Sequence, residues 1–288
     1  MHLLDGTYEL FRHHFGVPAG DRDPTDDVAA TRGVLWSVLT LLEGGVTHLG
    51  VATDHVIESF RNDLWPGYKS SAGVPEAILD QFNLLEDALA ALGVATFAMV
   101  ELEADDALAA AAVTASADPA VDQVVIMTPD KDLAQMVSGT RIVQLDRRSN
   151  KVTDEDGVKV KYGVAPESIP DWLALVGDSA DGYPGLAGWG KTSAATVLAR
   201  YGHIEAIPEH HWHWNVTVRG PSRLAATLNE NRDLALLFKD LATLRSDAKV
   251  LAAVDELRWR GPGEGLGQMA SRLRAWRFTD RVDALGRR

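Results

Sequence analysis

Acidic side chains recur in this 288-residue sequence directly after short apolar runs. The run 124–127 is typical of a buried strand, residues 133–136 are typical of the start of a helix, and Asp130 and Asp132 lie in the turn between them. Turns that follow parallel strands meet at one edge of an α/β sheet, where ligands bind. The pattern therefore predicts a carboxylate site at this edge. Helix capping is the alternative role for either residue.

The same arrangement occurs at three further predicted strands and in one turn that follows a helix. Its nine carboxylates are Asp5, Asp54, Glu103, Asp105, Asp106, Asp130, Asp132, Asp178 and Asp181. Because so many like charges in one place disfavour folding unless cations bind them, we expect a metal site. Oxygen ligands select Mg²⁺ or Mn²⁺, and several carboxylates suffice for two ions. Two such ions are a known arrangement for phosphodiester hydrolysis.

Composition narrows the classes of protein that this sequence can encode. The length and the 46% hydrophobic content suit one large or two smaller domains. The absence of cysteine excludes disulfides, thiolate metal sites and cysteine nucleophiles, and it fits a reducing cytoplasm. The sequence has no signal-peptide pattern and no long apolar run, so we expect a soluble cytoplasmic protein without a membrane partner. The net charge of −13 argues against a nucleic-acid partner, but cations bound to the nine carboxylates would offset much of it. Any DNA contacts should then be local and not spread over a broad basic face.

Two segments outside the predicted strands could hold a substrate. Segment 60–71 lacks a clean period and places Arg61 and Lys69 among aromatic residues, so either cation could lie at a scissile phosphate. The alternative is an ordinary exposed loop. Segment 210–214, H-H-W-H-W, has no partnering carboxylate or cysteine, and we interpret it as surface or packing in preference to a metal site.

A glycine-rich turn precedes a predicted helix in the second half of the chain. Glycines before a helix N-terminus expose backbone N–H groups to a phosphate. A helix precedes this turn, whereas a nucleotide-binding P-loop follows a strand, so a helix-hairpin-helix that holds a DNA backbone is favoured. The residues concerned are Gly185, Gly188, Gly190, Lys191, Thr192 and Ser193. Elsewhere, helices are predicted over 7–15 and 75–92, and two short strands are predicted around a hairpin turn at 154–157.

Five ordered motifs resemble the bacterial 5′→3′ exonuclease and flap endonuclease family, over roughly residues 2–245. They are D-G-T-Y-E-L-F-R, F-R-N-D-L-W-P-G-Y-K, E-A-D-D, T-P-D-K-D-L-A-Q and G-D-S-A-D-G-Y-P-G-L-A-G-W-G. The resemblance implies an α/β fold: a PIN-like domain over 1–163, with a parallel twisted sheet flanked by helices and a helical arch near 58–75. It also implies a helical DNA-binding region over 164–288 with a helix-three-turn-helix motif.

The resemblance further implies a metal-dependent DNA phosphodiesterase that cuts 5′ flaps, nicked DNA and duplex 5′ ends in replication and repair, leaving 5′-phosphates. The first ion would be bound by the residues at positions 5, 54, 103, 105 and 106, and the second by those at 130, 132, 178 and 181. Lys69 matches a lysine at the base of the arch, and Arg12 a basic residue near the entrance. Tyr8 could stack on a base there. The glycine turn would grip duplex DNA with a bound K⁺, to which Thr192 or Ser193 could add a hydroxyl.

Three positions depart from the family pattern: Ala72 replaces an arginine after the arch lysine, Pro129 replaces a glycine, and Lys191 is shifted by one position. We expect a stand-alone monomeric nuclease, for which RNA–DNA hybrids are a further candidate substrate. One alternative is a catalytically weak protein that binds DNA structures and keeps the fold. A PIN-type ribonuclease is another, which the hairpin region and the pair Asp178 and Asp181 disfavour.

Overall fold

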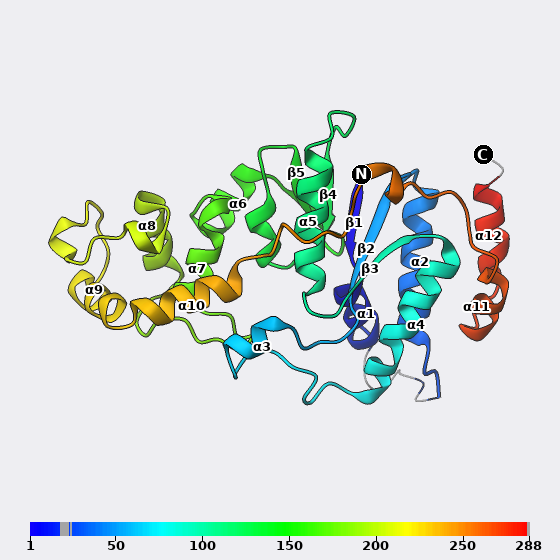
Figure 1. Cartoon of the computed structure of the whole chain (residues 1–288), viewed down its shortest axis with the longest axis horizontal. Coiled ribbons are helices and arrows are strands. Elements are labelled where there is room, and N and C mark those ends of the chain that lie inside the picture. The colour runs from blue at the N-terminus through cyan, green and yellow to red at the C-terminus, as the bar shows by residue number, and fades with distance from the viewer. Residues whose placement is uncertain (18–22, 24, 287–288) are drawn as a thin grey trace. The chain divides into compact units, whose positions relative to one another are not determined.

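The computed structural model describes residues 1–17, 23 and 25–286 (Figure 1). The chain forms two compact units, neither of which is continuous in sequence. Unit 1 comprises Met1–Ile57, Ser71–Thr128 and Ser246–Arg288, and unit 2 comprises Glu58–Ser70 and Pro129–Arg245. None of the helices in the described ranges is long and apolar enough to cross a membrane.

Unit 1 contains four parallel strands in the order β3-β2-β1-β4. They are β1 (His2–Asp5), β2 (Leu49–Asp54), β3 (Ala95–Met99) and β4 (Val124–Met127). All residues of β2 are buried, as expected for a central strand covered on both faces. Asp5 pairs in register with Ala52, and Asp54 with Met99, so the acidic strand ends lie at the same edge. The four strands of unit 1 are parallel, as predicted.

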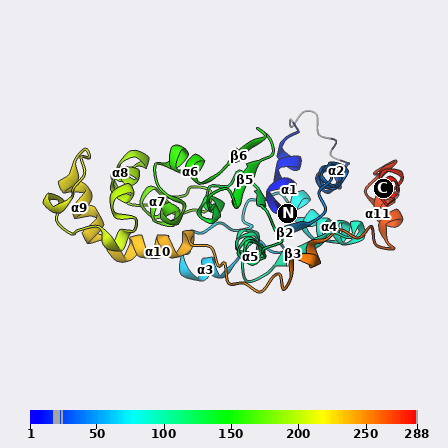
Figure 2. The ribbon, with the colours of Figure 1, turned by 90° about the horizontal axis from the view of Figure 1, so that it is seen from above.

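Helices cover these strands on both faces (Figure 2). Helix α5 packs against β1, β2, β3 and β4, and α1 and α4 pack against β2. The buried alanines of α5, among them Ala107 and Ala111, allow the helix to approach the sheet closely. The helices of unit 1 are α1 (Gly6–Phe15), α2 (Ala29–Glu43), α4 (Glu76–Leu92), α5 (Ala104–Ser116), η6 (Val254–Leu257), α11 (Leu266–Arg272) and α12 (Phe278–Leu285).

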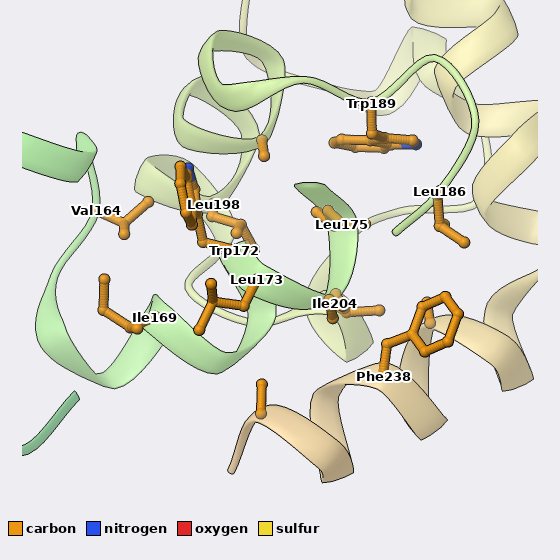
Figure 3. Packing of buried hydrophobic residues seen from close by; sticks show 14 of the residues in the cluster. Val164, Ile169, Trp172, Leu173, Leu175, Leu186, Trp189, Leu198, Ile204 and Phe238 are labelled. Carbon is orange, nitrogen blue, oxygen red and sulfur yellow. The ribbon is translucent and has the colours of Figure 1, made fainter. Parts of the chain in front are cut away.

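Unit 2 is mainly helical and has its own apolar core (Figure 3). Helix α7 lies at its centre, where Trp172 and Leu173 pack among side chains of α8 and α10 such as Leu198 and Phe238. The elements are α3 (Phe60–Leu64), η2 (Asp132–Met136), β5 (Ile142–Asp146), β6 (Lys151–Thr153), α6 (Glu155–Tyr162), η3 (Pro166–Ser168), α7 (Ile169–Val176), α8 (Lys191–Tyr201), η4 (Ile204–Ala206), η5 (His211–His213), α9 (Pro221–Glu230) and α10 (Arg232–Ala242).

The prediction of a hairpin turn at 154–157 is wrong. Strands β5 and β6 do form an antiparallel pair, but the chain reverses between Asp146 and Lys151. Asp154 instead begins α6, since its side chain accepts a hydrogen bond from the backbone N–H of Gly157 and so caps the helix.

The two short helices, η2 and α3, have too few residues to show a clear apolar period.

Candidate active site

Three carboxylates from two segments of unit 2 converge. Asp132 begins η2, and Asp178 and Asp181 lie in the turn that follows α7. One oxygen from each lies within 4.8 Å of the others, and no other group of three such ligands is found in the described residues. The turn is rigid, because the backbone N–H groups of Gly182 and Tyr183 donate to the Asp178 carbonyl at 2.9 and 3.0 Å.

The electrostatics of this acidic trio fit a bound cation. The Asp132 side chain is buried, and its Oδ1 has no hydrogen-bond partner among the described residues. Burial raises the pKa of Asp132 well above its usual value, and the neighbouring carboxylates of Asp130, Asp181 and Asp178 raise it further. A buried carboxylate oxygen without a donor is unfavourable unless a metal ion or a proton compensates it. Oxygen-only ligands suit Mg²⁺ or Mn²⁺.

Two lysines flank the acidic trio. Lys131 Nζ lies 2.7 Å from Asp178, and Lys69 Nζ lies 3.6 Å from Asp181. Lys131 was not among the predicted site residues, although its position between Asp130 and Asp132 was a signal that could have identified it. Its side chain offsets part of the negative charge that the carboxylates concentrate in the turn.

The main chain fixes Lys69 beside this site. Its backbone N–H donates to the Asp181 carbonyl at 3.0 Å, and its carbonyl accepts a hydrogen bond from Asn62 Nδ2 at 2.9 Å. Nearby, the Trp65 indole N–H donates to the Gly182 carbonyl at 3.1 Å. Segment 58–70 and the turn after α7 therefore position the lysine and the acidic trio together.

The structure corrects the prediction that Arg61 could reach a scissile phosphate. Its side chain is buried, its Nε donates to the Leu241 carbonyl at 2.8 Å, and Nη2 donates to the Thr243 carbonyl at 3.2 Å. These carbonyls lie at the C-terminus of α10, where a cation is favourable. Arg61 thus anchors α3 to α10 and has no path to a substrate.

Asp130 has a different environment from the acidic trio. It is exposed, and its Oδ1 accepts a hydrogen bond from the Asp132 backbone N–H at 3.0 Å. This is an Asx-turn contact. The N-cap residue of η2 is Lys131, and no side chain caps this helix, so the capping role that the sequence left open for Asp130 is not observed. The negative charge of Asp130 still helps to raise the pKa of Asp132.

The acidic residues of unit 1 lie at the carboxyl ends of its strands, as predicted. Asp5 caps α1 through the Tyr8 N–H at 2.8 Å and also accepts from the Thr128 hydroxyl at 2.9 Å. Asp54 accepts from the Ala104 N–H at 2.7 Å. Both carboxylates are buried, and both are held by donors, as a rigid ligand set requires.

The start of α5 supplies the remaining acids of unit 1. Glu103 and Asp106 are buried, and Asp106 Oδ2 accepts from the Glu103 N–H at 3.0 Å. Asp105 is half-buried. Within the described ranges these side chains do not form a group as close as the acidic trio, so their metal roles remain predictions.

Residues expected to contact DNA lie on α1 and around the glycine turn. Arg12 is partly exposed and pairs with Glu9, and Tyr8 is half-buried. A Cβ on Gly185 would lie 2.4 Å from the Gly177 nitrogen, so glycine is required there by packing as well as by its φ of +68°.

The residues that begin α8 differ in availability. Gly188 has a φ of +85°, and Gly190 precedes the first turn of the helix. Lys191 and Thr192 are exposed, whereas the Ser193 hydroxyl is already bonded to the backbone of Gly190. Lys191 and Thr192 therefore remain candidates for contact with a ligand.

A parallel sheet with acidic strand ends, together with a helical unit that carries a largely buried acidic trio, is typical of a metal-binding protein suited to phosphoryl chemistry. Two family models match the chain: "5′-3′ exonuclease, N-terminal resolvase-like domain" over residues 1–163 and "5′-3′ exonuclease, C-terminal SAM fold" over residues 164–264. The chain belongs to the 5′-3′ exonuclease family. The predicted family and fold class are confirmed.

Similar proteins include DNA polymerase I of Pseudomonas aeruginosa, which is 33% identical over 91% of this chain. The chain spans only 28% of the length of that polymerase. The 5′-3′ exonuclease of Buchnera aphidicola is 29% identical, with 90% of this chain and 86% of that protein covered.

Solved structures show the same fold. The T5 D15 protein co-crystallised with metal ions has a TM-score of 0.65 and 17% identity, with 98% of both chains covered. The catalytic core of Rad2 in complex with DNA substrate has a TM-score of 0.65 and 16% identity, with 98% of this chain and 90% of that chain covered.

Proposed function

We propose that this protein is a structure-specific 5′ nuclease that hydrolyses DNA at 5′ flaps and 5′ ends and leaves 5′-phosphates. The observation that carries the proposal is the buried Asp132 oxygen, which has no hydrogen-bond donor in the described chain and lies with the oxygens of Asp178 and Asp181. A protein that only binds DNA gains nothing from this costly arrangement. Family membership and the DNA-bound Rad2 structures support DNA as the substrate.

We assign Mg²⁺ or Mn²⁺ to the acidic trio and a further ion to the acidic residues of unit 1. Such ions supply a hydroxide nucleophile and stabilise the charge that develops on the phosphate. Asp132, Asp178 and Asp181 would act as ligands, and the turn after α7 holds two of them in place. Lys69, fixed through its own backbone, would add positive charge beside the reacting phosphate.

We assign binding of the duplex to the glycine turn and the start of α8, with K⁺ as a candidate ion there. Lys191 and Thr192 are exposed at this position, as backbone contacts require. Arg12 and Tyr8 are assigned to the entrance on α1. Nicked DNA and RNA–DNA hybrids are the further substrates to test.

The first experiment is cleavage of a 5′-flap DNA, labelled at its 3′ end, with Mg²⁺, with Mn²⁺ and with EDTA. We expect cuts near the flap junction with metal and intact DNA with EDTA. Asp132→Ala should abolish cleavage and retain flap binding. Asp156→Ala, which alters an exposed aspartate in the same unit, should leave both unchanged. Intact DNA in every lane together with tight flap binding would favour the alternative, a protein that binds DNA structures.

A further inference from the structure

The segment 209–214 is held firmly against the glycine turn of unit 2. Trp214 is buried, its indole N–H donates to the Pro208 carbonyl at 2.7 Å, and its ring lies 6.0 Å from that of Trp189. Trp189 lies between Gly188 and Gly190. Its own indole donates to the Leu224 carbonyl at 3.2 Å, which connects the turn to α9.

Further hydrogen bonds fix both ends of this segment. The Tyr201 hydroxyl donates to the His213 carbonyl at 3.3 Å and accepts from the Asn215 N–H at 3.0 Å. Asn229 Nδ2 donates to the Glu209 carbonyl at 2.7 Å. The segment is thus an ordered part of unit 2, and hydrogen bonds at both ends hold it in one conformation at the surface.

This rigid segment displays an aromatic side chain that folding does not bury. Trp212 is 66% exposed, and its ring stacks on that of His210 with centroids 4.4 Å apart and an angle of 14°. Exposing an indole in this way forgoes the stabilisation that its burial would give. Stacking on His210 fixes the ring, so a planar partner would meet it with little loss of side-chain entropy.

The stretch of sequence that contains both the glycine turn and Trp212 is basic, in contrast to the chain as a whole. Segment 182–225 contains four basic residues, Lys191, Arg200, Arg219 and Arg223, and two acidic residues, Glu205 and Glu209, whereas the whole chain has a net charge of −13. None of these four cations forms an ion pair with any described residue, whereas Glu205 pairs with Lys239. The Arg223 Nε lies 3.7 Å from the position that a Cβ would take on Gly188.

We propose that Trp212, backed by His210, is a platform on which an unpaired DNA base stacks beside the duplex held at the glycine turn. Rings that lie open in a basic setting bind single strands, because every base offers a π-face and the phosphates meet the cations. The inference rests on the proposed function and deepens it. It adds to the site a contact for a single-stranded extension of the duplex.

The test measures binding without metal, so that it does not depend on cleavage. Wild-type protein in EDTA is titrated onto fluorescent duplexes of about 20 base pairs that are blunt or carry a single-stranded extension of about six nucleotides, placed on each strand in turn. We expect one extension to tighten binding about fivefold or more, which corresponds to stacking of one base at about 1 kcal/mol.

Three variants locate the effect. Trp212→Ala should abolish the preference for the extension without changing affinity for blunt duplex, and Trp212→Phe, which retains a ring, should keep most of it. Trp276→Ala is the matched control, since that side chain is 77% exposed but belongs to unit 1. It should behave as wild type.

Three results would overturn the inference: no preference for either extension in the wild type, equal losses for Trp212→Ala on blunt and extended DNA, or the same loss for Trp276→Ala. Each of these leaves the proposed function intact when flap cleavage persists. A wild-type protein that binds no DNA and cleaves no flap would overturn both.

Discussion

Asp132→Asn should stabilise the metal-free protein and weaken its response to metal. The carboxylate oxygens of Asp132, Asp178 and Asp181 lie within 4.8 Å, and each like-charge pair at that distance costs about 3 kcal/mol at an effective dielectric constant of about 20. Lys131 and Lys69 offset much of this cost, and the raised pKa of Asp132 allows partial protonation to relieve more. We therefore expect a net gain of about 1–2 kcal/mol in the free energy of unfolding.

The substitution suits the purpose because asparagine has the shape of aspartate but no charge. Its amide N–H₂ can donate to the neighbouring carboxylates, which the Asp132 oxygens cannot do. The control, Asp63→Asn, alters an exposed aspartate of the same unit and should change the free energy of unfolding by less than about 0.5 kcal/mol.

Urea unfolding in EDTA and in excess Mg²⁺ measures both effects. Metal at about 100 times its dissociation constant should stabilise the wild type by about 2.7 kcal/mol, whereas the variant, which has lost a ligand, should gain much less. The difference in the free energy of unfolding between the two proteins should therefore become smaller, or change sign, when Mg²⁺ is added. A variant that is less stable than wild type in EDTA, or that gains equally from Mg²⁺, would refute the reasoning.

Three further predictions concern chemistry, backbone and pH. Lys69→Ala should slow single-turnover cleavage by about 10²-fold or more while changing flap affinity by less than about fivefold, and a larger loss in binding than in rate would assign the lysine to affinity. Gly182→Ala should lower the free energy of unfolding by several kcal/mol, because the new Cβ would lie 2.0 Å from the Gly67 carbonyl oxygen. Gly73 has the same φ of +85° but open space around it, so Gly73→Ala should lower the free energy of unfolding by only about 1 kcal/mol. Equal losses for the two variants in urea unfolding would contradict this. Burial lowers the pKa of His2 to about 4, so the unfolded chain binds the extra proton between about pH 6.5 and 4, and stability falls as the pH falls through that window. Relative to the His2→Asn variant, the free energy of unfolding of the wild type should fall by about 1–2 kcal/mol between pH 8 and pH 5; this value allows for the partial exposure of the ring. If the urea midpoints of the two proteins change in parallel with pH, this titration does not affect stability.

The sequence was sufficient for the sheet and for the acidic residues at its edge, because both follow from local patterns. Apolar runs fixed the strands, and Asp5 and Asp54 fell at the predicted carboxyl ends. Local patterns could not distinguish a hairpin turn at 154–157 from the start of a helix, since an Asp followed closely by Gly suits a hairpin as well as a helix N-cap. The hydrogen bond from Gly157 to Asp154 decided it.

Arg61 shows why side-chain roles are harder to predict than strands. A basic residue among aromatics suits a substrate clamp, yet the partners that bury its guanidinium are carbonyls about 180 residues later in the chain. Nothing local in the sequence encodes that distance. The same long-range packing makes segment 58–70 part of unit 2 and not of the sheet that precedes it.

That membership changes what positions the proposed catalytic lysine. The Lys69 backbone N–H donates a hydrogen bond to the Asp181 carbonyl, and the Trp65 indole N–H donates one to the Gly182 carbonyl. The turn that carries two of the proposed metal ligands therefore also fixes the lysine. Lysine side chains are long and flexible, and a charge is effective at a reacting phosphate only when its position is already set. Because the anchoring atoms are main-chain groups, many side-chain changes in segment 58–70 would preserve the lysine's position, whereas a shift of the turn after α7 would displace the lysine and the ligands together. Catalysis should therefore be more sensitive to the backbone of that turn than to the sequence of the segment that carries the lysine.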